Sequence, residues 1–300
     1  MSSQYSTFGR RLPLALCGVL AAACLLFTGL FLHHAGYVFP WETPAPVLAE
    51  DEGLRVHMLD VGQGLCMLLT CNGRAALIDT GTADSAEHVL SYLRQTGVKE
   101  LDYLFLTHPH LDHAGGGEAV CAAFPVACVV TPDCAESRAI FSLPEGWGYG
   151  LPVLWAEQGQ TYAVGGTAIT VLHPRASTPA DDLNVLSMVL LAEFEGARLL
   201  FTGDIPAEVE RSLIPLGYLQ VLQVSHHGSA SSTCAALLED TTPDFALISC
   251  GKNNDCGHPH QTVLQRLREV DAQTYRTDTD GDLVVSVIEG RVRVAPAVQK

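Results

Sequence analysis

The chain has 300 residues, of which 48% are hydrophobic, and its 33 acidic and 17 basic residues give a formal net charge of −16 at pH 7. This length and hydrophobic content are sufficient for a sizeable core, and no repeat or low-complexity tract occurs, which excludes repeat architectures. The acidic balance argues against a large nucleic-acid-binding surface, because affinity for nucleic acid depends on neutralising phosphates. Four basic residues can still form a local patch, namely Lys252, Arg266, Arg268 and Arg276.

The first element in chain order is an apolar segment. Residues 12–32 carry no charge and are long enough to cross a bilayer as a helix. Arg10 and Arg11 precede this segment, and no acidic residue occurs before Glu42. The positive-inside tendency therefore places residues 1–11 in the cytoplasm and the rest of the chain outside.

The remaining chain is expected to form a linker and one folded domain. Residues 33–53 contain several prolines and predict a linker, and residues 54–300 predict the domain. A single-pass signal anchor is the favoured interpretation of the apolar segment. Cleavage as a signal peptide, which would release a secreted domain, is the alternative.

A helix and a strand are predicted before the most informative motif. Residues 84–97, DSAEHVLSYLRQTG, have an apolar stripe at Val89, Leu90 and Leu93. Ser85 is the expected N-cap of this helix and Gly97 its end. The apolar, β-prone sequence LDYLFLT at 101–107 then predicts a strand. The order of elements places the next residues at the carboxyl end of a strand, where α/β layers usually carry their chemistry.

The segment LTHPHLDHAGGG at 106–117 places three histidines and an aspartate within six positions. In an extended chain alternate side chains share a face, so His108, His110 and Asp112 are expected to converge. His113 then falls on the other side of the turn. Neutral imidazole is the commonest metal ligand in proteins, and carboxylate completes sites built from N and O donors. The spacing therefore predicts a metal site.

Further motifs follow in an ordered series. They are ALIDTG (76–81), LLFTGD (199–204), VSHHGS (224–229) and ISCGKNNDCGHPH (248–260), with HMLDVGQGLCMLL (57–69) and DLNVLSMVL (182–190). HPHLDH matches the HxHxDH signature of the metallo-β-lactamase superfamily. Over about residues 54–290 the whole set resembles the extracytoplasmic hydrolase domain of ComEC-type competence proteins. The resemblance implies an α+β fold, a four-layer αββα sandwich of two facing mixed β-sheets with helices outside.

The resemblance also implies two divalent metal ions, Zn²⁺ or Mn²⁺. It assigns the first metal to His108 and His110, the second to Asp112 and His113, and the bridge to Asp204. One histidine of the pair His226 and His227 would complete the second site, and spacing does not decide which, because neighbours on a strand point to opposite faces.

One position departs from the superfamily pattern. Many members place a histidine upstream of the bridging aspartate, where this chain has Asn184. An amide oxygen is a weaker and harder ligand, which shifts the expected metal from Zn²⁺ towards Mn²⁺. His173 is the rival for this ligand position, although a structural hydrogen bond at a strand end is the favoured interpretation of His173.

Two residues are expected to be catalytic. Asp112 would orient and deprotonate the attacking water. The comparison with the family suggests that His258 contacts the substrate or the transition state, and the alternative is that the loop around Pro259 only caps the following helix.

Four further residues are candidates for substrate binding. Asp60 and Gln63 form either a glycine-flanked turn or the polar rim of the metal pocket. Lys252 and Asn253 are suitable donors for phosphate oxygens, although a lone lysine is more often a solvated charge.

Eight cysteines lie outside the apolar segment. An even number in an exported domain permits disulfides, although connectivity cannot be read from sequence. Cys250 and Cys256 flank a loop in a way that suits a short covalent clip.

Three functions fit these observations. The first is a membrane-anchored, metal-dependent phosphodiesterase or nuclease of the ComEC-like type, with a phosphodiester such as DNA as substrate. The second is a hydrolase of another ester of the cell envelope, such as phosphorylcholine. The third is a non-catalytic metal-binding accessory of a DNA-uptake assembly, which the presence of both Asp112 and Asp204 disfavours.

Overall fold

The computed structural model describes residues 53–175, 178 and 182–297. The predicted membrane segment, the residues before it and almost all of the predicted linker lie outside the described residues. Within the described part, no helix combines the length and the hydropathy that a bilayer span requires.

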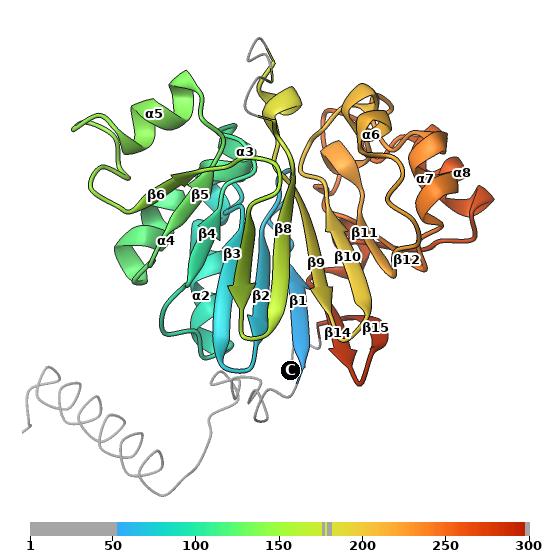
Figure 1. Ribbon diagram of the computed structural model, residues 1–300, viewed down its shortest axis with the longest axis horizontal. Helices are drawn as coiled ribbons and strands as arrows, with labels where there is room; N and C mark the ends of the chain where they lie inside the picture. Colours follow the sequence, from blue (N-terminus) through green and yellow to red (C-terminus); the bar gives the residue numbers. More distant parts are fainter. Residues whose placement is uncertain (1–52, 176–177, 179–181, 298–300) are drawn as a thin grey trace, which may run out of the picture. The chain divides into compact units, whose positions relative to one another are not determined.

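Two β-sheets face each other (Figure 1). The first sheet has the order β15-β14-β1-β2-β3-β4-β5-β6. Its strands are β1 (Leu54–Met58), β2 (Met67–Cys71), β3 (Arg74–Ile78), β4 (Tyr103–Phe105), β5 (Val129–Thr131), β6 (Val153–Trp155), β14 (Leu283–Ile288) and β15 (Arg291–Pro296).

The second sheet has the order β13-β12-β11-β10-β9-β8-β7. Its strands are β7 (Thr161–Val164), β8 (Thr167–His173), β9 (Val189–Phe194), β10 (Ala197–Phe201), β11 (Val221–Gln223), β12 (Phe245–Ile248) and β13 (Gln273–Arg276). Both sheets are mixed, because β3 to β6 and β10 to β13 pair in parallel whereas the other neighbours pair antiparallel.

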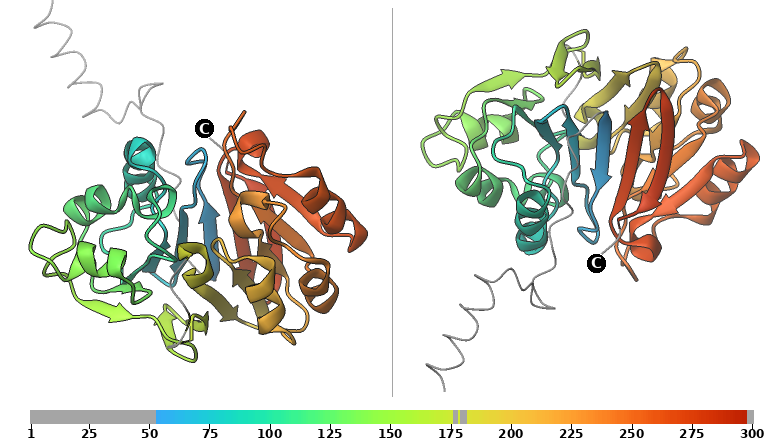
Figure 2. Two further views of the ribbon diagram at one scale, coloured as in Figure 1. Left: turned by 90° about the horizontal axis from the view of Figure 1, so that it is seen from above. Right: turned by 90° about the horizontal axis from the view of Figure 1, so that it is seen from below.

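Helices cover the outer faces of both sheets. The helices of the described residues are α2 (Ala86–Gln95), α3 (Leu111–Ala114), α4 (Gly117–Ala123), α5 (Ala135–Phe141), α6 (Ala207–Leu213), α7 (Ala235–Thr241), α8 (Gln261–Glu269) and α9 (Thr277–Asp280), and the 3₁₀ turns are η1 (Ala83–Ser85), η2 (Leu183–Leu186) and η3 (Ser225–Gly228). Seen from above and below, the teal and green helices lie on the opposite side of the strands from the orange and red helices (Figure 2). The predicted four-layer α+β arrangement of two mixed sheets is confirmed.

The side chains along β2 alternate between two hydrophobic cores. Met67 and Leu69 face the apolar cluster between the sheets, whereas Cys66 and Leu68 face the cluster beneath α2 and α4. Successive residues of a strand point to opposite faces, so a strand that is covered on both sides buries every side chain, as all five residues of β2 are buried. Burying one such leucine is worth about 1.5–3 kcal/mol relative to leaving it exposed.

The predicted helix at 84–97 is α2, and Ser85 is its N-cap residue as predicted, although its side chain does not cap the helix. Ser85 makes no side-chain capping bond to α2, because it ends the 3₁₀ turn η1. Thr82 caps that turn instead, and its hydroxyl oxygen accepts from the Ser85 backbone N–H at 3.3 Å. Val89 and Leu93 are fully buried, as the apolar stripe predicted.

Candidate metal centre

The candidate ligands follow the carboxyl ends of parallel strands in both sheets. His108 lies just beyond β4 of the first sheet, and Asp204 and His227 lie just beyond β10 and β11 of the second. Neighbouring parallel strands end at the same edge of a sheet, so these loops converge although the residues are far apart in sequence.

His108 and His110 form one half of the centre. His108 Nε2 lies 2.9 Å from His110 Nδ1. On the other side of its ring, His108 Nδ1 lies 3.1 Å from the hydroxyls of both Thr107 and Ser187. These two hydroxyls fix the ring so that Nε2 faces His110, which is the convergence that the alternation of side chains predicted.

Asp112 and His113 do not follow the predicted extended conformation. The chain turns into the short helix α3 directly after His110, so that Asp112 and His113 both face the centre. His113 Nε2 lies 4.0 Å from Asp112 Oδ2. The expectation that His113 falls on the other side was therefore wrong, because a helical turn rather than a strand carries the second half of the motif. Leu111, at the start of the same turn, is 79% exposed.

Four residues form a compact cluster of donor atoms. One ligand atom from each of Asp112, His113, Asp204 and His227 lies within 4.8 Å of all the others. Asp204 Oδ2 is central, at 3.2 Å from His113 Nε2 and 3.5 Å from His227 Nε2. His227 Nε2 also lies 3.4 Å from Asp112 Oδ2.

The structure separates His227 from its neighbour His226. His227 is buried, and its Nδ1 lies 2.9 Å from the carbonyl oxygen of Ser249, which leaves Nε2 to face the cluster. The His226 side chain is 28% exposed, and its Nε2 is 3.8 Å from Asp204 Oδ2. Both residues have positive φ in η3, so the strand rule that left this choice open does not apply to them. The geometry favours His227 as the ligand and leaves His226 at the rim.

Asp79 is a functional candidate that the sequence reasoning missed. It follows β3, is fully buried with φ +56°, and its Oδ2 lies 2.7 Å from His113 Nδ1. The same carboxylate accepts from the backbone N–H and from the hydroxyl of Thr107, both at 2.7 Å. Groups of this kind fix the tautomer and the orientation of histidine ligands. The signal for Asp79 in the sequence is the ALIDTG motif, in which the aspartate directly follows an apolar, strand-like segment.

The charges of the cluster are strongly coupled. Burial alone would lower the pKa of His113, but the carboxylates of Asp204 and Asp79 raise it well above its ordinary value. Burial would likewise lower the pKa of His227, and Asp204 with Asp112 raises it to about 9. Protons therefore occupy the places for which a cation would compete.

The two carboxylates of the cluster have lowered pKa values. Burial would raise the pKa of Asp204, but His113 and His227 hold it well below its ordinary value. Burial also opposes ionisation of Asp112, whose hydrogen bond with His227 and proximity to His113 lower its pKa to about 2. Both carboxylates are therefore anionic at neutral pH.

Unpaired buried atoms test whether this site fits a metal. His113 Nε2 and His227 Nε2 are buried and face carboxylate oxygens at 3.2 to 3.5 Å without well-aligned hydrogen bonds, and the buried Asp204 Oδ1 has no hydrogen-bond partner among the described residues. Buried polar atoms without partners are costly and rare in native proteins. Imidazole nitrogen and carboxylate oxygen are the donors that Zn²⁺ and Mn²⁺ bind, so the residues fit divalent cations.

The expected ligand Asn184 lies in η2, and the structure places Ser187 rather than Asn184 against the histidines. Ser187 Oγ contacts His108 Nδ1 and accepts from the Asp204 backbone N–H at 3.2 Å. Asn184 Oδ1 is buried without a hydrogen-bond partner in the described part of the chain. His173 Nε2 lies 2.7 Å from the carbonyl oxygen of Val185, in agreement with the favoured structural interpretation.

Two of the predicted contact residues, Gln63 and His258, contact each other beside His227. Gln63 Nε2 lies 3.2 Å from His258 Nδ1, and the His258 ring stacks 6.4 Å from the ring of His227. Burial and the neighbouring His227 lower the pKa of His258 to about 4, so its imidazole is neutral at neutral pH.

The other predicted contact residues are exposed. Asp60 is exposed, and its Oδ1 accepts from the Gly62 N–H at 3.2 Å, as the turn interpretation predicted. Lys252 and Asn253 are exposed on the loop after β12. In the part of the chain that the structure describes, no hydrogen bond joins either side chain to the metal ligands.

Two of the four residues in the predicted basic patch interact with other residues of the fold. Arg276 pairs with Asp278 at 2.6 Å, and Arg266 Nη1 donates to the carbonyl oxygens of Ser232 and Thr233. Lys252 and Arg268 are exposed.

The covalent clip predicted between Cys250 and Cys256 is wrong. All eight cysteines among the described residues are free thiols. Cys250 is buried and its Sγ lies 3.3 Å from Asp278 Oδ1, whereas Cys256 is exposed. The first thiol faces inward and the second faces solvent, so the two do not meet.

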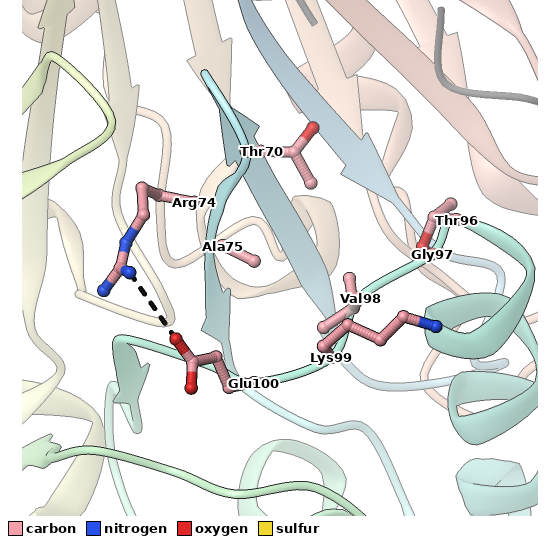
Figure 3. Close-up of a pocket in the computed structure, with 9 residues that line it drawn as sticks. Thr70, Arg74, Ala75, Thr96, Gly97, Val98, Lys99 and Glu100 are labelled. Carbon is pink, nitrogen blue, oxygen red and sulfur yellow. Dashed lines mark hydrogen bonds and ion pairs between the residues drawn. The ribbon is translucent and has the colours of Figure 1, made fainter. Parts of the chain in front are cut away.

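A hollow that contains none of the candidate ligands lies near the beginning of β3 (Figure 3). Its lining includes Arg74, Lys99 and Glu100, and Arg74 Nη1 lies 3.5 Å from Glu100 Oε1. Arg74 begins β3 and Asp79 follows its end, so the length of the strand separates this hollow from the metal centre.

Comparison with known proteins identifies the family. The sequence profile described as the metallo-beta-lactamase superfamily matches residues 59–252, which is more than half of the chain. The chain belongs to the metallo-beta-lactamase superfamily. The matched region contains Asp112, His113, Asp204 and His227, and it ends before His258.

Curated relatives of this superfamily member confirm the predicted ComEC-type resemblance. "Recombination protein 2" of Haemophilus influenzae is 34% identical over 252 residues, covering 82% of this chain and 30% of that protein. "ComE operon protein 3" of Bacillus subtilis is 33% identical over 252 residues, covering 76% and 32%. "Competence protein ComA" of Neisseria gonorrhoeae is 31% identical over 313 residues, covering 98% and 41%. The chain thus spans between 30% and 41% of the length of these relatives.

Solved structures agree with the superfamily fold. The metallo-beta-lactamase fold protein YhfI of Bacillus subtilis is 13% identical with a TM-score of 0.50, covering 81% of this chain and 100% of that one. The diiron β-hydroxylase CmlA of Streptomyces venezuelae is 13% identical with a TM-score of 0.51, covering 82% and 55%. At this identity the likeness concerns the fold alone.

Proposed function

We propose that this superfamily member is a metal-dependent hydrolase of phosphodiesters, with DNA as the substrate to test first. Relatives named for recombination and competence support a nucleic-acid substrate. The net charge of −16 implies that phosphates are held locally at the centre rather than by a broad basic surface.

The buried cluster of four donors carries this proposal. Asp112, His113, Asp204 and His227 would hold one cation, because their ligand atoms already lie together and two imidazole nitrogens face the carboxylates without well-aligned hydrogen bonds. The pair His108 and His110, together with the unpaired Asp204 Oδ1, would hold a second. The donor set of imidazole and carboxylate suits Zn²⁺ or Mn²⁺.

Bound divalent cations would supply Lewis-acid activation of water and of the phosphoryl group. Asp112 has an anionic carboxylate and a side chain that is 35% exposed, so its oxygen is available to orient the attacking water and to accept a proton from it. His258 has a neutral imidazole and lies beside His227, so it is available to donate a hydrogen bond to the substrate.

A side-by-side assay tests the proposal. The full chain would be purified, its bound metals measured, and its turnover compared on bis(p-nitrophenyl) phosphate, on single- and double-stranded DNA, and on choline-phosphate esters. We expect hydrolysis of the phosphodiesters. Cleavage of choline-phosphate or carboxylic esters alone would reject the phosphodiester substrate, and two bound metals without turnover would support the accessory function.

Two variants separate the roles of the carboxylates. Asp204→Asn removes a charge shared by both cation positions, so we expect loss of both metal occupancy and turnover. Asp112→Asn should retain more metal while turnover falls by about 10²–10⁴-fold, the range for a missing general base. Asp84→Asn, an exposed aspartate in η1, is the matched control and should change neither.

We also propose that residues 12–32 anchor the chain in a membrane with the hydrolase domain outside. Protease added to spheroplasts should then remove the domain. Digestion only after lysis would reject this orientation.

A further inference from the structure

We propose that Gln63 is a positioning residue that holds His258 as its Nε2–H tautomer, so that this N–H donates a hydrogen bond to a phosphoryl oxygen of the substrate. The identity of the substrate oxygen rests on the proposed function, whereas the tautomer does not. Gln63 was expected to bind substrate itself, whereas we assign it the role of orienting His258.

The orientation of the Gln63 amide is fixed by a backbone group. The N–H of Gly251 donates to Gln63 Oε1 at 3.1 Å. A backbone N–H can only donate, so the oxygen of the amide must face Gly251 and the nitrogen must face away from it. That nitrogen lies 3.2 Å from His258 Nδ1.

The amide nitrogen in turn sets the protons of the imidazole. Gln63 Nε2 has only hydrogens to offer, so His258 Nδ1 must accept and cannot carry a proton. A neutral imidazole with an unprotonated Nδ1 carries its proton on Nε2. The sequence of donors therefore runs from Gly251 through Gln63 to His258 Nε2–H.

The backbone around His258 is fixed as firmly as its ring. Asn254 Oδ1 accepts from the His258 N–H at 3.0 Å, while Asn254 Nδ2 donates to the carbonyl oxygens of His258 and Gly251 at 2.6 and 2.8 Å. A Cβ on Gly251 would lie 2.8 Å from the Gln63 backbone nitrogen, so only glycine permits this close approach of the two loops. The donor chain is thus held at both ends by the fold.

The ring of His258 lies beside two histidines of the candidate centre. The His258 ring lies 5.8 Å from that of His226 and stacks at 25° on that of His227. A fixed, neutral donor beside a developing oxyanion stabilises the transition state without reorganisation, and removing one such donor typically costs about 10²–10³-fold in kcat.

The isosteric substitution Gln63→Glu reverses the donor. A carboxylate would still accept from Gly251, but it would also accept from His258, which requires a proton on Nδ1. The test uses the full chain with ¹⁵N-labelled histidine, and His258→Asn assigns the resonance. We expect Nε2–H in the parent and a protonated Nδ1 in Gln63→Glu.

Kinetics on bis(p-nitrophenyl) phosphate provide the second readout. We expect kcat of Gln63→Glu to fall by about 100-fold, the loss typical of a missing oxyanion donor, with less change in KM. Because the two residues act as one unit, Gln63→Glu combined with His258→Asn should lose little more than His258→Asn alone. Gln95→Glu, which adds the same charge at the exposed end of α2, is the control and should match the parent.

The outcomes separate the two parts of the proposal. A proton on Nδ1 of His258 in the parent protein would overturn it even if every variant failed to fold. A fall in kcat without a change of tautomer in Gln63→Glu would overturn the positioning role. A parent that shows Nε2–H but cleaves no phosphodiester would overturn the substrate contact and the proposed function together, while leaving the assignment of the tautomer intact.

Discussion

Oδ2 of Asp79 lies 2.7 Å from Nδ1 of His113, and both side chains are completely buried. This contact leaves His113 Nε2 facing Asp204 at 3.2 Å. The carboxylate thus orients the imidazole and keeps its far nitrogen available for a cation.

Replacing Asp79 with asparagine should therefore weaken metal binding without touching a ligand. We expect the affinity of Asp79→Asn for Zn²⁺ to fall by about 10–100-fold, the usual cost of losing a group that orients a ligand. Isothermal titration of the metal-free full chain measures this, with Asp84→Asn as the exposed control. An unchanged affinity would show that His113 needs no such partner.

Adding a ligand should strengthen the weaker half of the centre. Asn184 Oδ1 is buried and unpaired within the described residues, and imidazole binds Zn²⁺ better than an amide oxygen does. We expect Asn184→His to tighten Zn²⁺ more than Mn²⁺, as measured by competition with a chelator. Asn72→His, in the exposed turn between β2 and β3, should leave both affinities unchanged. Equal effects at the two positions would place Asn184 outside the centre.

A close backbone contact supports Asp112. A Cβ on Gly64 would lie 2.4 Å from the Asp112 carbonyl oxygen, which also accepts from the Leu65 N–H at 3.1 Å. We expect Gly64→Ala to destabilise the fold by about 1–3 kcal/mol, as overpacking does, and to weaken metal binding as well. Urea unfolding and metal titration check the two effects.

Gly159→Ala is the control for this substitution. Its φ is +92°, but a Cβ there meets no other described atom within 4 Å. It should therefore carry only a backbone cost and retain the metal. Loss of metal in both variants would mean that the effect on Asp112 is indirect.

His57 should make the fold sensitive to acid. Its burial and the charge of Arg55 outweigh Asp282 and lower its pKa from 6.5 to about 4. The unfolded chain therefore binds more protons in this interval, so the stability contributed by neutral His57 is present above pH 6.5 and is lost as the pH falls towards 4. The loss amounts to at most about 3 kcal/mol.

Urea midpoints at pH 7 and pH 5 test this in the parent and in His57→Gln, and the variant should lose less stability on acidification. His88 gives a contrast of opposite sign, because its hydrogen bond with Asp282 outweighs burial and raises its pKa. His88→Gln should therefore weaken the fold more below pH 6.5 than at alkaline pH. Identical pH profiles of the parent and His57→Gln would contradict the assignment.

The family resemblance predicted the layers of the fold and the candidate ligands, whereas local patterns predicted less. Alternation of side chains predicted that His108 and His110 converge beyond a strand, and the apolar stripe predicted the buried face of α2. The predictions that failed concerned local backbone conformation, which contacts between distant parts of the chain determine. The helical turn α3 reversed the expected direction of His113, and the positive φ of His226 and His227 removed the strand rule.

Partnerships across long stretches of sequence could not be predicted from spacing. Asp79 and His113 are 34 positions apart, and Gln63 and His258 are 195 apart, so only the folded sheets bring them together. Cys250 likewise contacts Asp278 of α9, 28 positions away, and the number of cysteines in the sequence does not predict this contact.

The candidate ligands come from segments that follow strands of both sheets, so neither half of the chain holds the complete set. Cutting the polypeptide between β6 and β7 would leave His113 on one fragment and Asp204 with His227 on the other. Zn²⁺ would then favour reassociation of the two pieces, and the domain would behave as a split protein whose complementation responds to metal concentration.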